Sequence, residues 1–91
     1  MMLAFDEVLK AVERALESGM QSATGRDARV ELESLRSELQ SERASAVERG
    51  SVDREWLRAI VQDVAAWTPQ TELALLAALG RLAREGGSKE A

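Results

Sequence analysis

The chain has 91 residues, with 12 basic and 16 acidic side chains, and it contains neither cysteine nor histidine. This length suits one small domain with a modest core and leaves no room for a second folded domain. The missing cysteines exclude disulfides and thiolate chemistry, and the missing histidines exclude imidazole-based triads and metal sites. The slight excess of acidic side chains argues against a protein that coats phosphate.

The first ten residues, MMLAFDEVLK, contain no basic region and become acidic at Asp6, so they do not have the pattern of a secretory signal. The longest apolar-rich run, LALLAALGRLA, is too short to cross a bilayer. We therefore expect a cytoplasmic protein with no membrane association. Arginine exceeds lysine and alanine is abundant, which favours a bacterial source.

Turn-forming residues interrupt the chain at four places: residues 19–25, Gly50-Ser51, Thr68-Pro69 and Gly86-Gly87. Between these breaks, apolar residues recur with helical spacing, and no run alternates as a strand does. The sequence predicts an all-α fold, with a single helical domain over residues 1–85 and a disordered tail over residues 86–91. The expected helices span residues 3–18, 26–49, 52–67 and 69–85.

Two of the predicted helices have start signals in the breaks that precede them. Ser51 is expected to cap the third helix, whose first turn carries Asp53 and Glu55 at the positive end of the helix dipole. Thr68 is expected to cap the fourth helix, with Pro69 at its first position.

The first two segments carry a seven-residue pattern that predicts an antiparallel helical hairpin. In RVELESLRSELQSER the arginines recur at Arg29, Arg36 and Arg43, and the glutamates at Glu31 and Glu38. Heptad positions a and d are Met2, Phe5, Leu9, Val12 and Leu16 in the first segment and Ala28, Leu32, Leu35, Leu39 and Ala46 in the second. The expected layers are Leu16 with Ala28, Val12 with Leu32, Leu9 with Leu35, and Phe5 with Leu39. The two residue numbers have the same sum in every layer, which places the turn midpoint near residue 22.

In this hairpin Glu13 approaches Arg29, and Asp6 approaches Arg36. The arginine spacing is then a device that selects one register, while the leucine layers supply stability. The last two turns of the second helix extend beyond the first helix, and we expect the third helix to fold back and cover them.

Two other interpretations of the same charges remain open. A parallel homodimer would pair Glu31 with Arg36, and Glu38 with Arg43, of the other chain. Alternatively the charges form solvated helix faces, with weak local pairs of Glu33 with Arg29 and Arg36.

The two C-terminal segments are more apolar than surface helices usually are. The apolar residues of the third segment are Trp56, Leu57, Ile60, Val61, Val64, Ala65 and Trp67. In the fourth segment, Leu75, Leu79 and Leu82 make a core face, with Leu76 and Ala83 beside it, and Leu73, Ala77 and Gly80 make a smaller ridge on the other side.

A helix with two apolar faces predicts association with a second copy or with another helical protein. We expect the interface to contain Trp56, Trp67, Leu73, Ala77 and Gly80. The alternative is that the alanines serve only as strong helix formers, with no partner.

Carboxylates are the remaining candidates for catalysis. Glu38 with Glu42, or Glu13 with Glu17, have a spacing that could hold magnesium, but the facing positions are arginine or leucine. The sequence has no glycine-rich phosphate loop and no aromatic box. We therefore expect no enzymatic activity, cofactor, metal or small-molecule substrate.

The stretch RASAVERGSVDREWLRAIV resembles the skeleton of a helix-turn-helix, with an alanine four residues before Gly50 and an apolar residue six after it. Polar side chains at Ser45, Arg49 and Ser51 fill positions that the motif keeps apolar. Acidic side chains in the following helix would also repel phosphates, against only two basic ones, Arg54 and Arg58.

The sequence thus favours a non-enzymatic helical module for protein–protein interaction or regulation, such as an adaptor, and predicts a homodimer. A helix-turn-helix-like DNA-binding regulator is the alternative, although nucleic-acid binding is not expected.

Overall fold

The computed structural model describes residues 2–87, and these form four α-helices with no strand among them. The helices are α1 (Met2–Ser18), α2 (Arg29–Arg49), α3 (Arg54–Trp67) and α4 (Leu73–Gly87). The prediction of an all-α domain with four helices is confirmed. The fourth helix ends two residues later than predicted, and residues 88–91 of the predicted tail lie outside the described residues.

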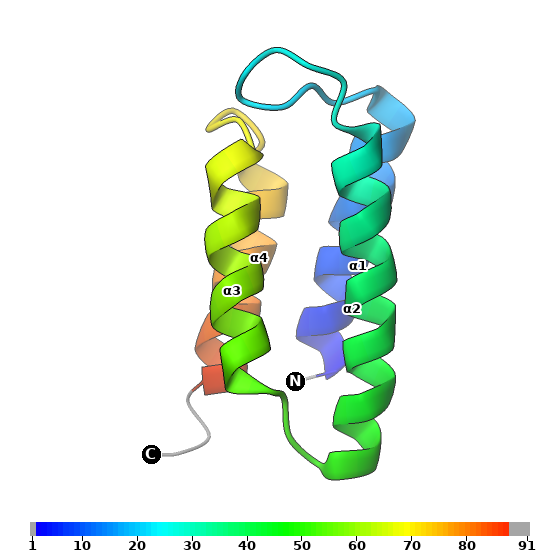
Figure 1. The fold of residues 1–91 in the computed structure, drawn as a ribbon, viewed down its shortest axis with the longest axis vertical. Coiled ribbons are helices and arrows are strands. Elements are labelled where there is room, and N and C mark those ends of the chain that lie inside the picture. Colours follow the sequence, from blue (N-terminus) through cyan, green and yellow to red (C-terminus); the bar gives the residue numbers. More distant parts are fainter. Residues whose placement is uncertain (1, 88–91) are drawn as a thin grey trace.

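The four helices run up and down along the long axis of the bundle, with α2 and α3 in front and α1 and α4 behind (Figure 1). The backbone of α1 packs closely against both α2 and α4, and α3 packs closely against α4. The backbones of α2 and α3 lie side by side without such a close approach. The bundle therefore has one open side, between α2 and α3.

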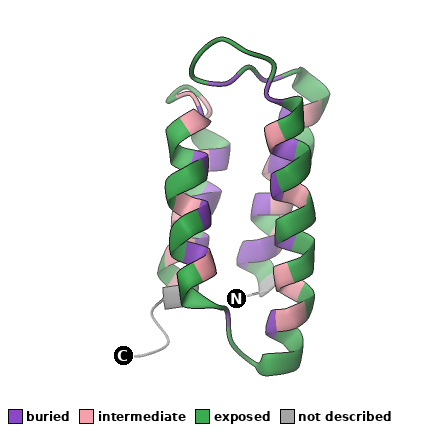
Figure 2. Ribbon diagram, viewed as in Figure 1, coloured by how far each residue is buried: buried purple, intermediate pink, exposed green. Residues whose placement is uncertain are grey.

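The core fills the space between all four helices, and the buried residues lie on the inward helix faces (Figure 2). Its largest fully buried side chains are Phe5, Val8, Val12, Leu32, Leu39, Val64, Leu75 and Leu82. On α1 the buried stripe also includes Ala4 and Ala15, whereas Leu9 and Leu16 are only half-buried. The predicted heptad positions of α1 therefore differ from the face that is buried. The reason is that α1 packs between α2 and α4 and not against α2 alone.

The turn between α1 and α2 is centred two residues later than predicted. Backbone hydrogen bonds join Ala28 N–H to Met20 C=O (3.2 Å) and Ser22 N–H to Arg26 C=O (2.6 Å), so the centre lies at residue 24. Moving the centre by two residues moves each residue's partner by four, about one helical turn. The predicted register, with its centre near residue 22, is wrong by that amount.

The loop geometry explains the shift. Gly19 ends α1 with a left-handed φ of 71°, Met20 N–H donates to Ala15 C=O (3.0 Å), and Gly19 N–H donates to Leu16 C=O (3.3 Å). These two bonds form a Schellman motif, which fixes the direction in which the chain leaves the helix. Met20 is then buried, and α2 begins only at Arg29, three residues later than predicted.

The charged side chains that were predicted to pair across the hairpin therefore do not form the predicted pairs. The Arg43 side chain pairs with Asp6 across a distance of 3.1 Å, so Asp6 does not pair with Arg36 as predicted. Among the described residues, Glu13 and Arg29 also form no ion pair. Since Leu32, Leu35 and Leu39 are buried in the bundle, α2 retains no leucine seam for a parallel coiled coil.

Asp53, and not Ser51, caps α3. Its Oδ1 accepts hydrogen bonds from the backbone N–H groups of Glu55 (3.0 Å) and Trp56 (3.2 Å). Gly50 ends α2 with a left-handed φ of 78°, and Val52 is buried before the helix starts. Burial of Val52 sets the position of the chain, so that Asp53 stands where a cap is needed.

The predicted start of the fourth helix is also wrong. Thr68 is the C-cap of α3: its N–H donates to Val64 C=O (2.9 Å) and its backbone is extended. The residue before a proline favours this extended conformation. Pro69 lies in the turn that follows, where its C=O accepts from Glu72 N–H (3.0 Å), and α4 starts at Leu73.

Asp53→Ala should lower the free energy of unfolding by about 0.5–2 kcal/mol, because two N–H groups of α3 lose their acceptor. Urea denaturation measures this change. Ser51→Ala is the matched control, and it should stay within about 0.5 kcal/mol of the wild type. A larger loss of unfolding free energy in the Ser51 variant than in the Asp53 variant would mean that Ser51, and not Asp53, caps α3.

Candidate interaction surface

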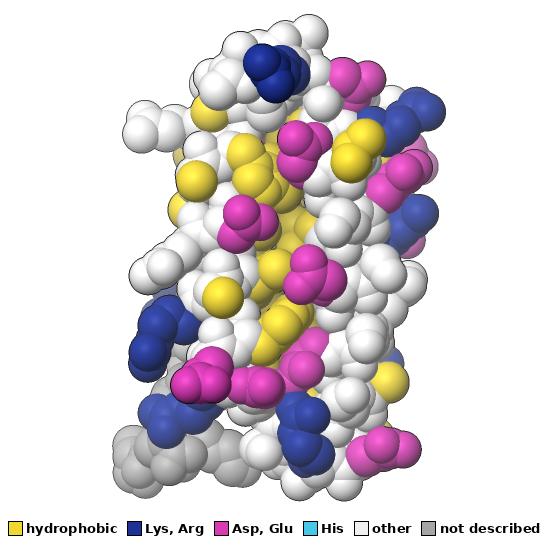
Figure 3. Space-filling view, viewed as in Figure 1, with side chains coloured by type: hydrophobic (Ala, Val, Ile, Leu, Met, Phe, Trp, Pro, Cys, Tyr) yellow, Lys and Arg dark blue, Asp and Glu magenta, His cyan; other side chains and the backbone are white. Residues whose placement is uncertain are grey.

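A groove of about 210 Å³ follows the open side of the bundle, and we call it the α2/α3 groove. Figure 3 shows a strip of hydrophobic side chains between the two front helices, with acidic side chains along both edges. The groove is lined by Val30, Glu31, Ser34, Leu35 and Glu38 of α2 and by Ile60, Asp63 and Trp67 of α3.

Helical periodicity places these residues. Glu31, Leu35 and Glu38 are spaced by four and three residues, so they follow one face of α2. Ile60, Asp63 and Trp67 have a matching spacing on α3. Leu35 and Ile60 are 2% and 6% exposed, so they form a buried floor, while Glu38 and Asp63 are exposed at the edges.

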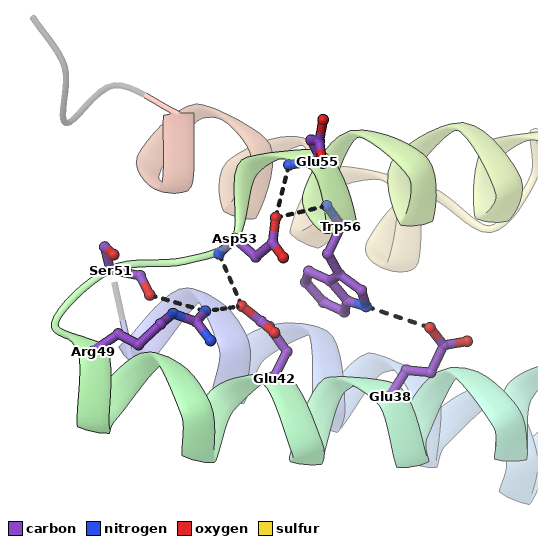
Figure 4. Close-up of polar contacts among 7 residues, drawn as sticks. All are labelled: Glu38, Glu42, Arg49, Ser51, Asp53, Glu55 and Trp56. Atoms are coloured by element: carbon purple, nitrogen blue, oxygen red, sulfur yellow. Dashed lines mark hydrogen bonds and ion pairs between the residues drawn. The ribbon is translucent and has the colours of Figure 1, made fainter.

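Both tryptophans lie on this side of α3. The ring of Trp56 lies between α2 and α3 (Figure 4), where it stacks on Phe5 with ring centroids 6.3 Å apart. Its Nε1–H donates to Glu38 Oε1 (3.3 Å), and Trp67 Nε1–H donates to Asp63 Oδ2 (3.4 Å). Each indole N–H is thus directed at a carboxylate of the groove edge.

A polar network joins α2 to the start of α3, beside the linker that connects the two helices (Figure 4). Glu42 Oε2 accepts from Asp53 N–H (2.9 Å) and pairs with Arg49, whose Nη2 also donates to Ser51 C=O (3.2 Å). The charge of Glu42 is therefore compensated within the chain. This network ties the last turns of α2 to the linker that leads into α3. Val47 in the last turn is 61% exposed, so the third helix does not cover the end of α2 as expected.

The charges of the groove edges are not compensated in this way. No ion pair within residues 2–87 involves Glu31, Glu38 or Asp63. The Oε1 atom of Glu31 is buried and has no hydrogen-bond partner. A buried carboxylate oxygen without a donor is unfavourable, so a cationic donor placed here would relieve that cost.

A second surface, which we call the cationic face, lies between α1 and α4 on the opposite side of the bundle. It is a shallow hollow of about 540 Å³ lined by Glu7, Lys10, Ala11, Arg14, Ala74, Ala77, Ala78, Arg81 and Arg84. Arg81 binds Glu7 (2.8 Å) and Glu85 (2.8 Å), and its hydrogen bond to Glu85 lowers the pKa of that carboxyl group. Lys10, Arg14 and Arg84 form no ion pair with any residue in the described range.

Three of the five predicted interface residues lie at one or the other of these two surfaces. Trp56 and Trp67 lie at the α2/α3 side, whereas Ala77 lines the cationic face. Leu73 is 71% exposed, and Gly80 is half-buried on the same helix. The predicted core face, Leu75, Leu79 and Leu82, is buried, so α4 has a core face and a separate exposed stripe.

Sequence reasoning did not identify the groove carboxylates as a site. The sequence predicts Glu31 and Glu38 as heptad charges and Glu38 with Glu42 as a possible magnesium pair, and Asp63 is one of the acidic side chains that would repel DNA phosphates. The seven-residue spacing of Glu31 and Glu38 indicates that they share one face of α2. Whether that face forms a site depends on which helix lies opposite.

The carboxylates of one candidate magnesium pair, Glu38 with Glu42, are engaged by other groups of the chain. Glu38 accepts from Trp56, and Glu42 is held by Arg49 and Asp53. The described part of the chain contains no group of three or more acidic residues arranged to hold a metal ion.

No protein-family model, curated protein or solved structure matches this chain. Within residues 2–87, no helix combines the length and the apolar character needed to cross a bilayer.

Proposed function

We propose that the chain is a non-enzymatic interaction module that binds a helix of a partner protein in the α2/α3 groove. One observation carries this proposal: an apolar floor lies between two edges whose carboxylates have no cation partner within the described residues. Binding of an amphipathic helix in a hydrophobic groove is a common mode of recognition. The non-enzymatic part of the proposal rests on the absence of histidine and cysteine from the sequence.

The groove defines the chemistry of the partner. Apolar side chains spaced by three and four residues would reach Leu35 and Ile60, and lysine or arginine side chains on both flanks would reach the edge carboxylates. Exposed ion pairs contribute only about 0–1 kcal/mol each, and the floor is already almost fully buried. Most of the affinity therefore comes from the apolar side chains of the groove that keep exposed surface, Val30, which is 75% exposed, and the half-buried Trp67. The charges supply selectivity, because an acidic helix would be repelled from both edges.

The DNA-binding alternative has less support. In Figure 1, α2 and α3 run side by side in opposite directions, whereas the helices of a helix-turn-helix cross at a large angle. Glu31, Glu38 and Asp63 would also repel phosphates from this side. Retention on heparin that is lost as salt rises would favour the alternative.

A synthetic amphipathic peptide, with a leucine stripe flanked by lysines, tests the proposal. We expect the peptide to bind the wild type saturably, and the tryptophan fluorescence of the chain measures this binding. The triple variant Glu31→Gln, Glu38→Gln, Asp63→Asn should raise the Kd about tenfold, which corresponds to about 1.4 kcal/mol. A peptide with glutamates in place of the lysines should not bind.

The control variant carries Glu17→Gln, Glu33→Gln and Glu48→Gln. It changes the net charge by the same amount at exposed positions that do not line the groove. Its Kd should stay near that of the wild type. Equal weakening in both variants would mean that the peptide responds only to net charge, and the groove proposal would then be rejected.

A further inference from the structure

We infer that the helix bound in the α2/α3 groove is α4 of a second copy of this chain, so that copies associate head to tail. This inference rests on the proposed function and adds the identity of the partner. The surface that enters the groove is the cationic face, through the exposed stripe of α4.

Charge complementarity supports the pairing. The α2/α3 groove is lined by three carboxylates, Glu31, Glu38 and Asp63, and by no basic side chain, which gives a charge of −3. The cationic face is lined by four basic side chains and one acidic side chain, Glu7, which gives 4 − 1 = +3, and Glu85, which pairs with Arg81, reduces this to +2. Both surfaces belong to every copy, although the whole chain has a net charge of −4.

The exposed stripe of α4 also has the apolar chemistry that the groove accepts. It begins with Leu73 and Ala77 and continues with Arg81 and Arg84. Leu73 is 71% exposed and can reach an apolar floor, and the small side chain of Ala77 allows a close approach of the helix backbone. The cations of this stripe, with Lys10 and Arg14 on α1, would then reach the groove edges.

A two-fold symmetric dimer does not use this complementarity. A two-fold contact could pair the groove with the cationic face only if both lay on one side of the chain, and they lie on opposite sides. A two-fold contact would therefore place the cationic face against a second cationic face, or the groove against a second groove. Like charges would then face each other across the contact, which is unfavourable. Because the groove and the cationic face lie on opposite sides of the bundle, a head-to-tail contact leaves one of each free to bind further copies.

Two blocked variants test this arrangement. The groove variant carries Glu31→Gln, Glu38→Gln and Asp63→Asn, and the face variant carries Lys10→Gln, Arg14→Gln and Arg84→Gln. Light scattering should show that the mass of the wild type grows with protein concentration and falls as salt is added. Each variant alone should be a monomer with unchanged circular dichroism.

An equimolar mixture of the two variants should form one-to-one pairs and nothing larger, because it contains one intact groove and one intact cationic face. A mixture that stays monomeric while the wild type associates would overturn the head-to-tail contact, as would a variant that dimerises alone.

The same samples separate the two proposals. If the wild type is a monomer at every concentration at low salt but binds the leucine–lysine peptide through the groove carboxylates, self-association is wrong and the helix-binding function stands. If the wild type neither associates nor binds the peptide, both proposals fail.

Discussion

Leu79→Glu should unfold the chain, whereas Ala77→Glu, two residues away on the same helix, should leave its helix content unchanged. Leu79 is 3% exposed in the core, and Ala77 is exposed on the cationic face. An unpaired carboxylate costs several kcal/mol when it is buried. A small domain has only about 5–15 kcal/mol of stability in total.

Circular dichroism and urea denaturation measure both variants. Because glutamate is a good helix former, Ala77→Glu should change the free energy of unfolding by less than about 1 kcal/mol. It should also reduce self-association, because it places a carboxylate in the surface that meets the acidic groove. Similar destabilisation by the two substitutions would contradict the division of α4 into a core face and an exposed stripe.

Phe5→Ala should lower the free energy of unfolding by about 3–5 kcal/mol, the usual cost of removing a fully buried aromatic ring. Phe5 is 0% exposed and supports the ring of Trp56, so the tryptophan emission should shift to longer wavelength as water reaches that ring. Leu3→Ala on the same helix is the control. Leu3 is 69% exposed, and its loss should cost less than about 0.5 kcal/mol.

Urea denaturation compares the two variants directly. An equal loss in both would mean that Phe5 is not part of the core and that Trp56 does not depend on it. The ring of Trp56, which donates to Glu38 at the groove edge, would then lack its support from α1.

The four helices could be predicted because local signals define them. Gly50, with its left-handed φ, ends α2 as the break at Gly50-Ser51 indicated, and the spacing of Leu75, Leu79 and Leu82 identified the core face of α4. The start of α3 could not be located as well. Ser51 and Asp53 are both good caps, and the burial of Val52, a tertiary effect, decides between them.

The register and the site depend on tertiary arrangement more strongly. A heptad pattern assumes one partner helix, but α1 has two, so Val8 and Ala15 are buried where the pattern placed Leu9 and Leu16. The charge spacing on α2 did not reveal which helix lies opposite Glu31 and Glu38. Only the bundle topology brings Asp63 to the other edge of the same groove.

The indole N–H signals of Trp56 and Trp67 test docking in the α2/α3 groove most directly, because each group donates to a groove carboxylate. In an NMR titration of the isotope-labelled face variant, which should be a monomer with an intact groove, we predict that the leucine–lysine peptide shifts both indole signals together with the backbone amides of residues 30–38. The amides of α1 and α4 that line the cationic face should not move. Unchanged indole signals, with shifts confined to α1 and α4, would contradict the account.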